Sequence, residues 1–174
     1  MGGVQSTFSN SSSGTGYSKE FAKITIDGSP VKGNSKEDGY TDYFEVHNPF
    51  AFHTFMGTVG PVFDIITLKL KVCEGSEKLL SCFLDGGHKD ITIEIVRKKK
   101  DPNNKSYPYY KTTYTGCHLY DMLLATDGND ELVMDMSFAP TDKVEIELLV
   151  PAKTGDEPKK VGPLRYSIQE NKKI

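Results

Sequence analysis

The chain has 174 residues, 37% of them hydrophobic, with a formal net charge of −3 and a pI near 5.8. This length can bury one substantial core, and the slight acidic excess argues against general nucleic-acid binding, which needs surplus Lys and Arg. No apolar run approaches the roughly 18 residues of a membrane helix, and the N-terminus lacks the basic-then-apolar order of a secretory signal. We therefore expect a soluble product made in the cytoplasm, without direct membrane insertion.

Residues 1–18 are rich in Ser, Gly, Asn and Thr and contain few apolar side chains. Ordering such a segment costs backbone entropy with little burial to offset it. We predict a flexible N-terminal tail over residues 1–18 and a single folded domain over residues 19–174.

The next part of the chain alternates apolar and polar residues with the period of two that is typical of β-strands. We predict a strand over residues 21–26, closed by a turn over 27–30, and then a long exposed loop over 33–41. Residues 42–56 predict a long strand or a bent pair, broken near Pro49, with one apolar face formed by Phe44, Val46, Phe50, Phe52 and Met56. After a turn over 57–61, residues 62–72 predict another strand.

One stretch, residues 76–88, is predicted to be helical. Ser76 stands where an N-cap belongs, Glu77 favours the positive end of the helix dipole, and Gly86 and Gly87 supply positions with φ > 0 that end a helix. An apolar face at the three-to-four spacing of a short amphipathic helix is formed by Leu79, Leu80, Phe83 and Leu84.

The second half of the chain again alternates. Predicted strands cover residues 90–99, 107–124, with a bulge at Gly116, two segments of 132–150 and finally 164–169. Turns are predicted at 101–104 and near Pro140, and a polar loop at 153–162. Strands joined by short turns predict a mainly β fold, an antiparallel β-barrel of about eight strands with one short α-helix packed on it.

Residues that often carry chemistry have simpler interpretations here. Cys73, Cys82 and Cys117 stand at no metal-ligand spacing and are predicted to be reduced, mostly buried thiols. His47 and His53 would need a third metal ligand from elsewhere, so solvent-facing histidines are favoured.

Neighbouring residues Cys117 and His118 point to opposite faces of a strand, which disfavours a nucleophile–base pair. The basic run 97–100 is predicted to be a solvated hairpin end that protects a sheet edge rather than an anion-binding patch. Residues 127–131 resemble part of a calcium loop without its full ligand spacing, and a turn is favoured. We expect no catalytic residue, cofactor site or metal site.

The order of elements and several residue strings resemble the Hcp family, the haemolysin-coregulated proteins that form the inner tube of the bacterial type VI secretion system. The strings are Ile26-Asp27-Gly28 and the charged segment 32–38, the helix with Ser76, Lys78-Leu79-Leu80, Cys82 and Gly87-His88, the strand 133–139, and the C-terminal strings 162–168 and 171–174. The resemblance covers residues 19–174. Where the family often has Trp, this chain has residues 49–52 and Tyr166.

The resemblance implies a structural subunit, not an enzyme, that forms hexameric rings stacking into a tube. The tube would be ejected to deliver effectors to target cells, and secretion through its own apparatus would need no signal peptide. Sheath, spike and effector proteins are the implied partners. We expect a ring-stacking loop at Asn34, Ser35, Lys36, Glu37 and Asp38, and a subunit-contact helix face at Glu77, Lys78 and Ser81.

A different class of function stays open at this point. Tyr107, Tyr109, Tyr110 and Tyr114 lie near one predicted hairpin and could form the surface of a stand-alone carbohydrate- or protein-binding barrel. Ordinary aromatic content of β-strands explains them more simply. A hydrolase that uses Cys117 and His118 is a third, weaker hypothesis.

Overall fold

A computed structural model describes residues 19–47, 51–87, 90–100, 106–150 and 158–174. The predicted tail, the predicted break at Pro49, His88 and the predicted turn at 101–104 lie outside these residues, as does most of the predicted loop at 153–162. The division into a tail and one domain stays a prediction.

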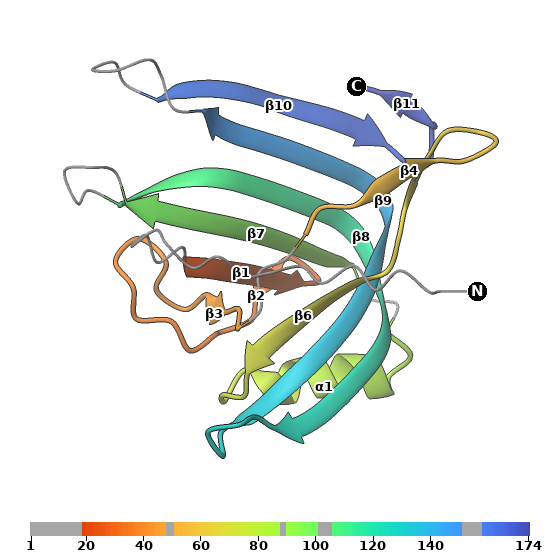
Figure 1. Ribbon diagram of the computed structural model, residues 1–174. Coiled ribbons are helices and arrows are strands. Elements are labelled where there is room, and N and C mark those ends of the chain that lie inside the picture. The colour runs from red at the N-terminus through yellow and green to blue at the C-terminus, as the bar shows by residue number, and fades with distance from the viewer. Residues whose placement is uncertain (1–18, 48–50, 88–89, 101–105, 151–157) are drawn as a thin grey trace, which may run out of the picture.

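The described chain is mainly antiparallel β-structure with one helix (Figure 1). In chain order the elements are β1 (Lys19–Ile26), β2 (Ser29–Pro30), β3 (Phe44–Glu45), β4 (Thr54–Met56), β5 (Pro61–Phe63), β6 (Ile66–Lys71), α1 (Ser76–Leu84), β7 (Ile91–Lys100), β8 (Ser106–Thr126), β9 (Leu132–Val150), β10 (Lys159–Ser167) and β11 (Lys172–Lys173). The prediction of a mainly β, antiparallel fold with one short helix is confirmed.

Nine strands form the main sheet, in the order β11-β10-β9-β8-β7-β1-β2, with β3 paired to β1 and β6 paired to β9. The two longest strands, β8 and β9, curve through the molecule (Figure 1). On the edge away from β8, β9 pairs with β6 in its first half and with β10 in its second half. These two strands therefore hold both parts of the sheet together.

Bulges account for the bending of β8 and β9. The register between them shifts at Gly116, which has a φ of 64°, and again at Tyr120. Opposite Gly116 lie Thr141 and Asp142, and the Thr141 hydroxyl donates to the Gly116 carbonyl at 2.6 Å. The predicted bulge at Gly116 is confirmed, but the predicted turn near Pro140 is wrong because β9 runs on through it.

The curved sheet closes only in part. β3 pairs with β1, and one isolated bridge joins Val46 to Leu70 of β6. The His47 backbone N–H also donates to the Lys69 carbonyl at 2.8 Å. In the described residues no continuous ladder joins β3 to β6, so the prediction of a barrel is correct only in part.

The core lies inside this curved sheet. In β7 the apolar residues at alternate positions all point into it, as the alternation in the sequence predicts. Ile91, Ile93 and Ile95 are fully buried, as are Leu68 and Leu70 of β6. Burial of an aliphatic side chain stabilises by about 1.5–3 kcal/mol, so these strands have one permitted register.

Helix α1 covers one end of the core, beside β8, and differs from its prediction in two details. Its N-cap is Gly75, and Ser76 is instead its first residue, with Oγ accepting the Cys73 N–H at 3.0 Å. Leu79 and Cys82 are buried, whereas Leu84, which the sequence places on the apolar face, is 81% exposed. The predicted end is confirmed, since the Gly87 N–H donates to the Cys82 carbonyl and both Gly86 and Gly87 have positive φ.

Two predicted strands are shorter or divided. Residues 42–56 contain the two short strands β3 and β4, which agrees with the predicted alternative of a divided pair and not with one long strand. Met56 is 77% exposed instead of sharing the buried face. Residues 62–72 divide into β5 and β6. The last long strand begins earlier than predicted, at Lys159, and ends at Ser167.

No helix among the described residues is long and apolar enough to cross a membrane.

Candidate functional site

The loop of residues 33–43, which contains the predicted ring-stacking residues, has a fixed backbone. The Gly33 N–H donates to the Asp42 carbonyl at 2.7 Å, and the Ser35 N–H donates to the Tyr43 carbonyl at 2.8 Å. The Asp42 N–H donates back to the Ser35 carbonyl at 3.0 Å. Gly33 permits this because a Cβ there would overlap the Tyr43 backbone. The loop is predicted correctly, but its predicted exposure is wrong at Ser35, which is buried.

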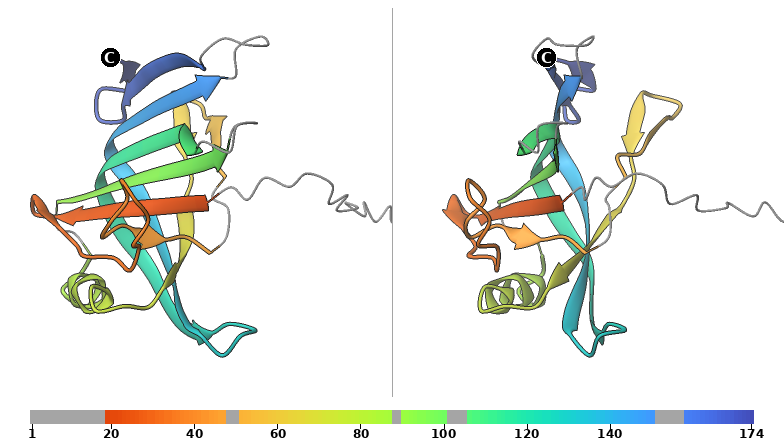
Figure 2. Two further views of the ribbon diagram at one scale, coloured as in Figure 1. Left: turned by 90° about the vertical axis from the view of Figure 1, so that its left-hand side faces the viewer. Right: turned by 60° about the vertical axis from the view of Figure 1, so that its left-hand side comes forward.

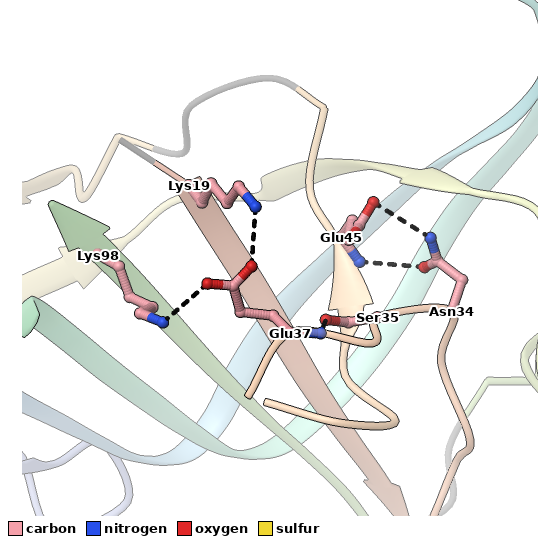
Figure 3. A network of polar contacts seen from close by, with 6 residues as sticks. All are labelled: Lys19, Asn34, Ser35, Glu37, Glu45 and Lys98. Carbon is pink, nitrogen blue, oxygen red and sulfur yellow. Dashed lines mark hydrogen bonds and ion pairs between the residues drawn. The ribbon is translucent and has the colours of Figure 1, made fainter. Parts of the chain in front are cut away.

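An ion cluster ties this loop to the sheet (Figure 3). Lys19 of β1 donates to one carboxylate oxygen of Glu37 at 2.8 Å, and Lys98 of β7 donates to the other at 3.2 Å. The bonds from Lys19 and then Lys98 lower the pKa of Glu37, and the bond to Glu37 raises the pKa of Lys19. The side chain of Lys98 is only 9% exposed, and the Glu37 carboxylate offsets the cost of placing an ammonium group there.

A small aromatic cluster lies under the same loop. The Tyr40 ring stacks on Phe21 at a centroid distance of 5.0 Å, and the Lys98 ammonium lies 4.7 Å from the Tyr40 centroid. The Tyr43 hydroxyl donates to the Glu94 carboxylate at 2.9 Å, and burial followed by the Glu94 charge raises the pKa of Tyr43. Phe21 is buried yet outside the main core cluster, which indicates a second, smaller core beneath the loop.

The five predicted loop residues divide into two groups. Asn34, Ser35 and Glu37 make contacts within the subunit: Asn34 Oδ1, for instance, accepts the N–H of Glu45 at 3.1 Å. The side chains of Lys36 and Asp38 are exposed. Of the five predicted residues, these two present opposite charges to the solvent.

On the helix, the predicted contact residues Glu77, Lys78 and Ser81 are all exposed. They share the outer side of α1 with Leu84. Glu77 and Ser81 also line an open groove of about 690 Å³ that runs between the helix and residues 72–74. The structure thus places the predicted helix residues at the surface, where a partner could reach them.

The basic run at the end of β7 is not the solvated hairpin end that was predicted. Arg97 binds the carboxylate of Glu20 at 2.6 Å, and the Glu20 side chain is 4% exposed. Lys99 lies 5.1 Å from the Tyr109 ring centroid, while Lys98 holds the loop. The prediction failed because the carboxylate partners of Arg97 and Lys98 lie 77 and 61 residues away in the sequence.

Sequence reasoning missed the most exposed apolar residues. Strands β4 and β5 form a separate two-stranded hairpin that stands apart from the main sheet (Figure 2). The hairpin and the residue just beyond it expose five apolar side chains, at 40% to 83% exposure: Phe55, Met56, Val59, Val62 and Ile65. The glycines that flank this turn, Gly57 and Gly60, are the sequence signal that could have placed these residues on a projecting hairpin.

A second group of exposed apolar side chains lies at the other end of the molecule, where β8 turns into β9. It comprises Tyr120, Leu123, Leu124 and Leu132, each about half exposed, at 46% to 54%. In the turn itself the Asp127 carboxylate accepts the N–H groups of Asn129 and Glu131, which lowers the pKa of Asp127. The prediction of a turn at 127–131 is confirmed.

The tyrosines do not gather on one exposed surface. Tyr114 is fully buried in the core against Phe138, and burial raises its pKa. Tyr107, Tyr109 and Tyr110 are half-buried, with Arg97 or Lys99 over their rings. This arrangement removes the observation on which a carbohydrate-binding surface depended.

Residues with metal-binding or nucleophilic chemistry stay apart. Among the described residues there is no group of three or more His, Cys, Asp and Glu side chains that could hold a metal ion. Cys117 is fully buried, and burial raises the pKa of its thiol.

Comparisons with known proteins concern the fold. No protein-family model matches the sequence, and no curated protein sequence matches it. Among solved structures, the chain is similar to one described as a type six secretion system protein, at 22% identity and a TM-score of 0.70, covering 88% of this chain and 99% of that one. It is similar to Hcp1 from Salmonella typhimurium at 18% identity and a TM-score of 0.65, covering 90% and 99%. It is also similar to the secreted protein Hcp3 from Pseudomonas aeruginosa at 13% identity and a TM-score of 0.62, covering 83% and 97%. The chain therefore has the Hcp fold that the resemblance predicted.

Proposed function

We propose that this chain is a structural subunit of a type VI secretion inner tube, and that it assembles into hexameric rings which stack. The observation that carries the proposal is the match to a type six secretion system protein over 88% of this chain and 99% of the matched one. Function in such a protein is assembly, not catalysis.

The distribution of exposed apolar side chains supports association between copies. The hairpin group around Met56 and the β8–β9 group around Leu123 lie on different parts of one subunit. Large exposed apolar groups mark interaction sites more often than free surface. When one patch of a subunit binds a different patch on the next copy, the contact is heterologous, and such contacts close into rings when the rotation permits.

Two further sets of residues are assigned roles in the assembly. Lys36 and Asp38 of the 33–43 loop meet the neighbouring ring, while Asn34, Ser35 and Glu37 hold the loop in position for that contact. Glu77, Lys78 and Ser81 of α1 contact a neighbouring subunit. Sheath, spike and effector proteins bind the assembled tube, which is ejected from the bacterium and delivers effectors to target cells.

Light scattering coupled to size exclusion tests the ring. At high protein concentration the wild type is expected at six times the subunit mass of 19.3 kDa. Met56→Lys places a charge on the hairpin and should shift the protein to the monomer, while urea unfolding of the dilute subunit changes by no more than about 0.5 kcal/mol, as for other exposed positions. A wild type that stays monomeric, or a Met56→Lys protein that still forms rings, would count against the proposal.

Stacking is tested separately by charge reversal. Lys36→Glu combined with Asp38→Lys should shorten stacks of rings without dissolving single rings or lowering subunit stability, because both side chains are exposed. Equal loss of stacking and folding would contradict the assignment.

A further inference from the structure

The tip of the β4–β5 hairpin is bound by one side chain from the C-terminal end of the chain. The Asn171 side-chain amide donates from Nδ2 to the carbonyl of Val59 at 2.6 Å. Its other atom, Oδ1, accepts the hydroxyl of Tyr166 in β10. One amide therefore joins the hairpin tip to the last long strand of the main sheet.

The local backbone is arranged around this amide. Asn171 has a φ of 50°, in the left-handed region that Asn tolerates better than most residues. A Cβ at Gly60 would overlap Asn171 Oδ1, so the turn of the hairpin needs a glycine where the amide approaches. The Gly57 N–H donates to the Gly60 carbonyl at 2.9 Å and completes that turn.

Few other contacts could fix the direction of the hairpin. It is a separate two-stranded sheet, and an isolated two-stranded hairpin is at best marginally stable in water. The Phe63 ring lies 5.8 Å from Tyr166 and 6.2 Å from Phe52, at the base of the hairpin. Met56 and Val59, near the tip, are 77% and 83% exposed. In the part of the chain that the structure describes, the hairpin above its base thus depends on the Asn171 contact.

We infer that Asn171 is a positioning residue that holds the β4–β5 hairpin in the orientation in which it docks onto a second copy of this chain. The inference rests on the proposed function. A second copy is the occupant because the same chain carries a different exposed apolar group at the β8–β9 turn, which offers a heterologous contact a second apolar surface. Preorganising the hairpin lowers the ordering cost of that contact.

Two substitutions distinguish the role of the Asn171 side-chain amide from that of the left-handed backbone conformation of residue 171. Asn171→Asp keeps an acceptor for Tyr166 but replaces the donor to Val59 with an oxygen, and Asn171→Gly keeps the left-handed backbone without a side chain. Gln169→Glu is the matched control, because it makes the same amide-to-acid change at an exposed position of the same turn.

Two readouts are made on the same samples: hydrogen exchange of the Gly57 amide, and the ring fraction by light scattering at fixed concentration. Loss of one hydrogen bond of ordinary strength corresponds to about a ten-fold change in an equilibrium, so both Asn171 variants should exchange Gly57 about ten-fold faster and retain at most about a tenth of the rings. Gln169→Glu should match the wild type in both. Unchanged exchange, or faster exchange with rings intact, would overturn the inference. If the wild type forms no rings, both the proposed function and the docking role of the hairpin are overturned. Hydrogen exchange of the Gly57 amide would then still decide whether Asn171 holds the hairpin.

Discussion

The contact between Glu37 and its two lysines gives the sharpest test of how the 33–43 loop is held. Glu37→Gln keeps the size of the side chain but removes the charge that both Lys19 and Lys98 contact. The Lys19 side chain is 61% exposed, so the loss of its pair costs at most about 1 kcal/mol. The Lys98 side chain is 9% exposed and loses the carboxylate that the loop supplies.

The Tyr40 ring limits the cost. It stays 4.7 Å from the Lys98 ammonium, and an interaction of this kind contributes about 0.5–2 kcal/mol. We therefore expect Glu37→Gln to lower the free energy of unfolding by about 1–2 kcal/mol, less than the 3–5 kcal/mol of a fully buried ion pair that loses one partner.

Urea unfolding measures the total change in the free energy of unfolding. Hydrogen exchange of the Ser35 and Asp42 amides shows whether the lost stability is in the 33–43 loop. The control is Glu170→Gln, which removes the carboxylate of an exposed pair with Lys172 whose side chains are 57% and 62% exposed. The control should change stability by less than about 0.5 kcal/mol. Equal effects of the two substitutions would refute the argument that the partial burial of Lys98 sets the cost.

The pH dependence follows from the lowered pKa of Glu37. A carboxyl group whose folded pKa is depressed stabilises the fold fully above its unfolded pKa of about 4.3, and this contribution is lost as pH falls through the folded value. The stability difference between wild type and Glu37→Gln should narrow below about pH 4. A difference that widens on acidification would contradict the pairing.

Two other predictions concern the core and the thiols. Ile93→Ala should cost about 2–5 kcal/mol in urea unfolding because Ile93 is fully buried, whereas Leu84→Ala, at an 81% exposed position, should change stability by no more than about 0.5 kcal/mol. Cys73, which is half-buried, should react with a neutral thiol reagent in the native protein well before Cys117, whose pKa is raised by burial, and peptide mass mapping after short exposure should show this order. Faster labelling of Cys117 would mean that the core opens more readily than its packing indicates.

The parts of the fold that the sequence predicted correctly depend on local pattern. Period-two alternation placed Ile91, Ile93 and Ile95 in the core, and the glycine at position 116 marked the bulge. The predicted turn near Pro140 failed for a tertiary reason. A proline lacks the backbone N–H that a strand needs, but Pro140 lies beside the irregular pairing at Gly116, where a missing donor is tolerated.

The candidate site was predictable only in part for the same reason. The polar composition of residues 33–41 indicates a loop, and the helical pattern leaves Glu77, Lys78 and Ser81 on the outer side. Nothing local indicates that Glu37 pairs with Lys98, since 61 residues separate them. The exposed hairpin was missed because Phe55 and Met56 have the composition of a core strand, whereas β4 and β5 form a two-stranded sheet separate from the main sheet.

The central claim is that this chain forms six-membered rings. Negative-stain electron microscopy of the purified wild type at high concentration tests it most directly, because the number of subunits around the ring is counted in top views. We expect rings with six-fold symmetry and some short stacks. A field of single subunits at every concentration, or closed assemblies of another symmetry, would contradict it.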